Sequence, residues 1–225
     1  MQKQTINVPG AEGFAQPRTR RDFFKALAVA GATGVAGASL FTSKKASAQI
    51  GGTQEGDAGI LNFALTLEFL ERDFYAMAVD RGVLSGPALG VVIMLRDTEQ
   101  AHVDFLTTAL QGAGATPAPK PEFTFPPESL ASQAGVLQLA SVLEPTGVGA
   151  YLGAGPMIQN PDFLEAAGTI AGVEGDHVVA IRNLLGFVPP TTTPFPEALT
   201  KDQVLAAIAP FLGMGKMPAT GGPGE

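Results

Sequence analysis

The chain has 225 residues, enough for one ordinary domain with a hydrophobic core and some additional segments. It is 45% apolar and 16% charged, a globular composition, and its net charge of −7, with no basic stripe beyond the N-terminus, argues against nucleic acid as a partner. The absence of cysteine excludes disulfides, thiolate metal sites and cysteine nucleophiles, so any metal must be held by carboxylate and imidazole groups, which suit iron, manganese or zinc.

The first 48 residues have the pattern of an export signal. Arg20 and Arg21 precede an Ala/Gly-rich apolar run over residues 26–41, and Ala46-Ser47-Ala48 resembles a small-residue cleavage site. The pattern is similar to that of a twin-arginine signal. A short transmembrane anchor is the alternative, but the run is shorter and less apolar than the roughly 20 residues that a span needs. We therefore expect export to the periplasm or cell envelope, with the mature chain starting near Gln49 and keeping no transmembrane anchor.

Removal of residues 1–48 takes away seven basic and two acidic residues, which leaves the mature chain with a net charge of −12. A protein this acidic is not expected to bind an anionic membrane by electrostatics. The resemblance to a twin-arginine signal also implies that the protein is carried already folded, often because a cofactor was inserted in the cytoplasm.

Four long segments with helical apolar periodicity follow, each bounded by capping or stop signals. They run from about Asp57 to Arg81, from just after Ser85 to Gln111, from near Ser129 to about Ile158, and from Asn160-Pro161 to Leu185. A capping box, Thr200-x-x-Gln203, then opens a short helix to Leu212, and the Gly/Pro tail beyond it is expected to be disordered. No strand pattern competes, so the predicted fold is all-α.

The connections between these segments predict the topology. Short links near residues 82–85 and 159–160 indicate two antiparallel helix hairpins. The Pro-rich loop over residues 113–128 could reach about 50 Å, whereas a 26-residue helix is about 39 Å long, so the loop can cross the whole bundle. We expect a four-helix bundle over residues 49–186, followed by a linker, the short helix and the tail over residues 187–225.

Both histidines stand three residues after a glutamate, in Glu99-x-x-His102 and Glu174-x-x-His177. Residues at i and i+3 share one face of a helix, so each pair can point into the bundle together. The alternative is an exposed Glu–His contact of little consequence on each helix.

Both tyrosines follow a glutamate by seven residues, Tyr75 after Glu68 and Tyr151 after Glu144, which again places each pair on one helix face. Each half of the chain thus reads Glu-x6-Tyr, a short turn, and Glu-x-x-His. In each hairpin, the glutamate of the Glu-x6-Tyr motif lies about as far from the end of its helix as the Glu-x-x-His motif lies from the start of the next helix. The two motifs are therefore expected at the same level of the bundle. All the candidate ligands are therefore expected to meet at mid-bundle.

Four glutamates buried at one level would repel each other and lose hydration, which costs several kcal/mol per charge. Two divalent ions would offset that charge. One Glu from each of two helices, with Glu-x-x-His from each of the other two, is the arrangement of di-iron and di-manganese carboxylate proteins.

Residues 57–186 resemble the ferritin-like superfamily, particularly its exported bacterial branch. The matching stretches are residues 67–75, 97–102, 143–144, 151–154 and 174–177. The resemblance implies two iron or manganese ions bound by six residues, with Glu99 and Glu174 able to bridge both ions: Glu68, Glu99, His102, Glu144, Glu174 and His177. It implies that Tyr75 and Tyr151 complete the catalytic site by hydrogen-bonding to these ligands.

Several alternatives stay open at this stage. Pro145 directly follows Glu144 and is expected to kink or bulge the third helix, which could displace that ligand, and nearby glycines weaken the helix further. Glu71 is either a surface charge near Arg72 or part of the metal pocket. The tyrosines could be plain core aromatics, and the C-terminal helix could either pack on its own bundle or dock a partner.

The functional hypothesis is redox chemistry at a dinuclear centre, with peroxide or dioxygen as the reactant, in a protective role in the cell envelope. The alternative is a non-catalytic envelope protein whose metals, if any, stabilise the bundle. Either protein could form a homo-oligomer or bind an envelope partner.

Overall fold

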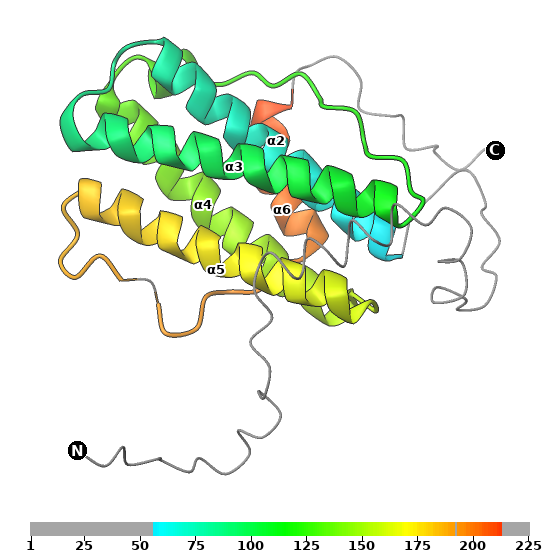
Figure 1. The fold of residues 1–225 in the computed structure, drawn as a ribbon. Coiled ribbons are helices and arrows are strands. Elements are labelled where there is room, and N and C mark those ends of the chain that lie inside the picture. Colours follow the sequence, from blue (N-terminus) through cyan, green and yellow to red (C-terminus); the bar gives the residue numbers. More distant parts are fainter. Residues whose placement is uncertain (1–55, 192, 213–225) are drawn as a thin grey trace, which may run out of the picture. The chain divides into compact units, whose positions relative to one another are not determined.

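The computed structural model describes residues 56–191 and 193–212, all within one compact unit, Gln49–Glu225. These residues form a helical bundle without strands, which confirms the all-α prediction (Figure 1). The helices are α2 (Asp57–Asp80), α3 (Gly86–Gly112), α4 (Gln133–Ala154), α5 (Pro161–Leu184) and α6 (Lys201–Ile208). Short 3-10 turns cover Pro127–Leu130, Gly155–Met157 and Ala209–Phe211. The predicted signal, the start near Gln49 and the C-terminal tail lie outside the described residues.

Two helix hairpins make up the bundle, as predicted: α2 packs against α3, and α4 against α5. The connection after α3 runs back along the bundle to the start of α4 (Figure 1). Asn62 on α2 fixes this connection, because its side chain accepts a hydrogen bond from Ala118 N at 2.6 Å and donates one to Thr116 O at 3.2 Å. None of the described helices has the length and apolar character needed to span a membrane.

The third helix differs from its predicted bounds at both ends. It begins at Gln133 instead of near Ser129, because Pro127–Leu130 forms a separate turn and Ser132 is the residue that caps the helix, accepting a hydrogen bond from Gly135 N at 3.1 Å. Its α-helical geometry ends at Ala154, where Gly155–Met157 tightens into a 3-10 turn that contains Pro156.

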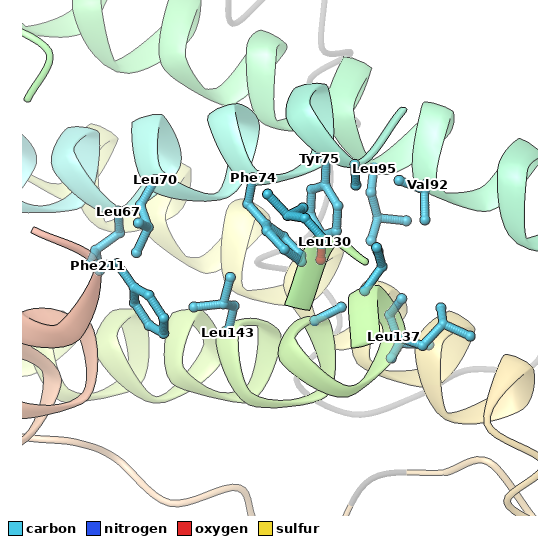
Figure 2. Packing of buried hydrophobic residues seen from close by; sticks show 14 of the residues in the cluster. Leu67, Leu70, Phe74, Tyr75, Val92, Leu95, Leu130, Leu137, Leu143 and Phe211 are labelled. Atoms are coloured by element: carbon cyan, nitrogen blue, oxygen red, sulfur yellow. The ribbon is translucent and has the colours of Figure 1, made fainter. Parts of the chain in front are cut away.

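The C-terminal helix packs on its own bundle. Its capping box forms as predicted, with Thr200 Oγ1 accepting from Gln203 N and Gln203 Oε1 accepting from Thr200 N. The helix ends at Ile208, and its residues Val204 and Ile208, with Phe211 just beyond, are buried in the core. Figure 2 shows Phe211 close to Leu67 and Leu70 of α2, with Leu143 of α4 beside it.

Helix α4 continues through Pro145, and two of its glycines have a steric reason to be there. The segment before α6 crosses α4 so closely that a Cβ atom at Gly153 would lie 1.9 Å from the Leu199 carbonyl oxygen. The Leu199 N–H donates to the Gly149 carbonyl at 2.9 Å, and a Cβ at Gly149 would lie 2.6 Å from the Leu199 side chain. Because Gly149 and Gly153 have no side chains, the segment before α6 can cross α4 closely, and this crossing brings α6 onto the bundle.

We expect Gly153→Ala to destabilise the protein by about 1–3 kcal/mol, because the added methyl group overlaps backbone that has to move. Gly168→Ala is the matched control, since Gly168 is also helical but a Cβ atom added there would meet nothing within 4 Å. That change should instead gain about 0.5–1 kcal/mol through helix propensity. Urea unfolding measures both, and equal stabilities would contradict the close crossing at Leu199.

Candidate metal centre

All six predicted ligands lie inside the bundle at its middle. Glu68 comes from α2, Glu99 and His102 from α3, Glu144 from α4, and Glu174 and His177 from α5. The four glutamates have no exposed surface, and His102 and His177 are 8% and 1% exposed. The i, i+3 spacing therefore does place each Glu–His pair on an inward face, which excludes the surface alternative.

The six side chains form two overlapping groups. Glu68, Glu99, His102 and Glu174 make one, and Glu99, Glu144, Glu174 and His177 make the other, with one donor atom per residue lying within 4.8 Å of every other in its group. Glu99 and Glu174 belong to both groups. The geometry thus provides two neighbouring positions for metal ions with two shared carboxylates.

The two halves use equivalent contacts. His102 Nδ1 lies 2.8 Å from Glu99 Oε2 and 3.1 Å from Glu68 Oε2. His177 Nδ1 lies 2.9 Å from Glu99 Oε1 and 3.2 Å from Glu144 Oε2. Glu144 therefore contacts His177 in the same way as Glu68 contacts His102. Pro145 does not turn the Glu144 side chain away from the site.

The tyrosines connect the two hairpins. Tyr75 on α2 donates its hydroxyl hydrogen to Glu144 Oε1 on α4, and Tyr151 on α4 donates to Glu68 Oε1 on α2. In each glutamate the other oxygen, Oε2, is then the one that faces a histidine. The tyrosines are thus more than core aromatics, because each holds one carboxylate in place.

Glu71 is a fifth buried glutamate, for which the sequence left two interpretations open. Its side chain is only 3% exposed, so the surface alternative is wrong. Across from it lies Gly147, where a Cβ atom would be 3.4 Å from Glu71 Oε1 and 3.5 Å from Glu174 Oε2. Glu71 and Gly147 are equivalent in the repeat, each three residues after the first glutamate of its half. The carboxylate of Glu71 in one half therefore lies directly against the glycine at the equivalent position of the other half.

Burial dominates the electrostatics of the site. It raises the pKa of Glu68 to about 8, and the pKa values of Glu71 and Glu144 well above the usual range. For Glu174 the effect of burial is outweighed by His102 and His177, which lower its pKa to about 2. Burial also disfavours charged His102, but the surrounding glutamates outweigh it and raise its pKa to about 12. Without metal, burial favours the neutral form of Glu68, and protonated His102 offsets the charge of neighbouring carboxylates.

Several ligand atoms at the centre lie close to one another but make no hydrogen bond of good geometry, namely Glu99 Oε1, Glu144 Oε2, both carboxylate oxygens of Glu174, and both ring nitrogens of His177. Buried polar atoms are rarely left so, because the lost hydration is not recovered. Carboxylate oxygens and imidazole nitrogens that meet in this way suit iron, manganese or zinc. The residues present therefore fit a dinuclear centre.

A family model for the ferritin-like domain matches residues 56–187, which is more than half of the chain and spans α2 to α5. The chain belongs to the ferritin-like domain family. This membership confirms the superfamily to which the helical pattern and the doubled Glu-x-x-His motif pointed. No curated protein matches the chain.

The pKa shifts of this ferritin-like centre predict how the metal-free protein responds to pH. An acid whose pKa is raised on folding binds its proton more tightly in the folded state, so its contribution to stability is fully present below the unfolded pKa of 4.5 and is lost as the pH rises to the folded value of about 8 for Glu68. Glu71, Glu144 and His102 act in the same direction.

We therefore expect the free energy of unfolding of metal-free protein to fall between pH 5 and pH 8, as measured by urea unfolding. Glu68→Gln, which cannot ionise, should make the dependence shallower. A metal-free protein that is more stable at pH 8 than at pH 5 would contradict the buried, proton-bearing cluster.

Proposed function

We propose that the protein holds two iron or manganese ions and reacts with peroxide or dioxygen in a catalase-, peroxidase- or ferroxidase-like manner. The observation that supports this best is the pair of overlapping ligand groups that share Glu99 and Glu174. Two adjacent ions can share a two-electron step, which is the chemistry that the metals would supply when bound.

The protein residues have separate tasks in this proposal. Glu68 and His102 would hold one ion, Glu144 and His177 the other, and Glu99 and Glu174 would contact both. Tyr75 and Tyr151 orient Glu144 and Glu68 by hydrogen bonding. Burial of all four glutamates keeps bulk water from the centre, which strengthens electrostatic interactions there.

We place this function outside the cytoplasm, in a protective role in the periplasm or cell envelope. The support is the twin-arginine-like pattern around Arg20 and Arg21, which lies outside the described residues. The reason to favour chemistry over a purely structural metal site is the position of Glu144. A displacement of Glu144 by Pro145 would favour a purely structural site, whereas Glu144 Oε2 lies 3.2 Å from His177 Nδ1.

Turnover by metal-loaded protein tests the proposal. Protein loaded anaerobically with Fe(II) or Mn(II) is mixed with hydrogen peroxide or dioxygen. Loss of dioxygen is followed with an oxygen electrode, and loss of peroxide by its ultraviolet absorbance. We expect consumption well above that of the same concentration of free metal, and a loss of about tenfold or more in Glu99→Gln, because a shared ligand is weakened. A protein that carries two ions per chain and consumes neither reactant would support the structural alternative instead.

A further inference from the structure

An apolar pocket lies at the end of the bundle where α2 begins and α4 ends. Its walls come from four helices and the link after α4, and include Ala64, Leu67, Leu106, Ala150, Tyr151 and Phe163. Among the described residues that line it, only Tyr151 has a polar side chain. The free volume is about 30 Å³, whereas one water needs about 10–15 Å³ by the same measure, so the pocket has room for a molecule of about two heavy atoms.

This pocket adjoins one half of the metal centre. Tyr151 in its wall donates a hydrogen bond to Glu68, Leu67 is the chain neighbour of Glu68, and Leu106 lies one helical turn after His102. The side chain of Tyr151 therefore lies between the pocket and the half of the centre that contains Glu68 and His102.

The opposite half is packed more tightly. Tyr75, which is equivalent to Tyr151 in the repeat, has no exposed surface, whereas Tyr151 is 6% exposed. His177 is 1% exposed against 8% for His102. Around Tyr75 the bundle is filled by Phe74 and leucines such as Leu95, none of them exposed (Figure 2). The two halves of the repeat thus provide equivalent candidate ligands, but they differ in how closely the residues around each tyrosine are packed.

The chemistry of the lining selects the occupant. The hydroxyl hydrogen of Tyr151 is already donated to Glu68, so a polar molecule would lose its hydration without finding a donor in the pocket. The described residues do not enclose the pocket completely, but its walls are apolar, and apolar cavities lined by leucine, isoleucine and phenylalanine bind small apolar molecules such as xenon. An uncharged apolar molecule of the size of dioxygen fits both the free volume of the pocket and its apolar lining.

We infer that this pocket binds a small apolar molecule of the size of dioxygen and delivers it to the half of the centre formed by Glu68 and His102. The binding site is independent of the metals, whereas the delivery step rests on the function proposed above.

Xenon is the probe for the binding site. Crystals of the full chain under xenon pressure should show a xenon atom in the pocket. Ala64→Leu and Ala150→Leu, which fill the pocket from α2 and from α4, should each remove it. Ala76→Leu is the matched control, because Ala76 is a half-buried residue of α2 outside the lining, and it should keep full xenon occupancy. Wild-type protein without xenon in the pocket, or folded Ala64→Leu and Ala150→Leu proteins that both retain it, would overturn the inference.

Oxidation kinetics test the delivery. In stopped-flow mixing, Ala64→Leu loaded with Fe(II) should react with dioxygen several-fold more slowly than Ala76→Leu, while both keep the same metal content. Equal rates would overturn delivery through the pocket. If loaded wild-type protein reacts with neither dioxygen nor peroxide, the proposed function fails, while the xenon result still decides whether the pocket binds apolar molecules.

Discussion

Replacing either His102 or His177 with alanine is expected to lower the bound metal from about two ions per chain towards one, and replacing both is expected to abolish tight binding. Each histidine belongs to only one of the two ligand groups, so each change removes the sole imidazole from one ion. Elemental analysis after equilibrium dialysis measures the occupancy. Asp97→Ala is a suitable control, because it removes an exposed carboxylate from the same helix as His102 and should leave the occupancy unchanged.

The glutamates extend this prediction. A displacement of Glu144 by Pro145 would make Glu144→Ala milder than Glu68→Ala, but the two side chains make equivalent contacts with a histidine and a tyrosine. We therefore expect the two changes to lower occupancy equally. If the double histidine variant binds as much metal as the wild type, the metal lies elsewhere and the dinuclear centre is wrong.

Removal of metal is expected to lower the melting temperature by on the order of 10 °C. Ions that bind only the folded state stabilise it by about 2.7 kcal/mol per site at a concentration one hundred times the dissociation constant, and 1 kcal/mol corresponds to about 2–4 °C in a protein of this size. The physical cause is that only the folded bundle brings the two ligand groups together, so the ions bind the folded state and not the unfolded chain.

Thermal scans of chelated and reloaded protein measure this difference, and reloading should restore the higher value. The double histidine variant is the control, since its melting temperature should no longer respond to added metal. Identical scans of wild-type protein with and without verified metal would show that the ions do not bind between the helices.

The helices and the convergence of the six candidate ligands at mid-bundle could be predicted because their signals are local or repeated. The stop at Gly82, where φ is +65°, and the capping box at Thr200 are encoded within a few residues. The Glu-x-x-His motif occurs twice at nearly the same distance from a Glu-x6-Tyr motif, and this repeat relates residues far apart in the chain to one level of the bundle.

Other features depend on contacts that no local pattern records. Glu71 is buried against Gly147 on another helix, and only an alignment of the two halves of the repeat would have pointed to that pair. The glycines at 149 and 153 suggested a weak helix, whereas their role depends on Leu199, about fifty residues further along the chain. No sequence pattern indicated that the bundle is packed closely around Tyr75 and left open beside Tyr151.

Anomalous diffraction from crystals of metal-loaded protein tests the dinuclear centre most directly. Data collected at the absorption edge of the bound metal should give two peaks at mid-bundle, one beside Glu68 and His102 and one beside Glu144 and His177, with Glu99 and Glu174 between them. A single peak, or peaks confined to surface carboxylates while the six buried residues contact no metal, would contradict it.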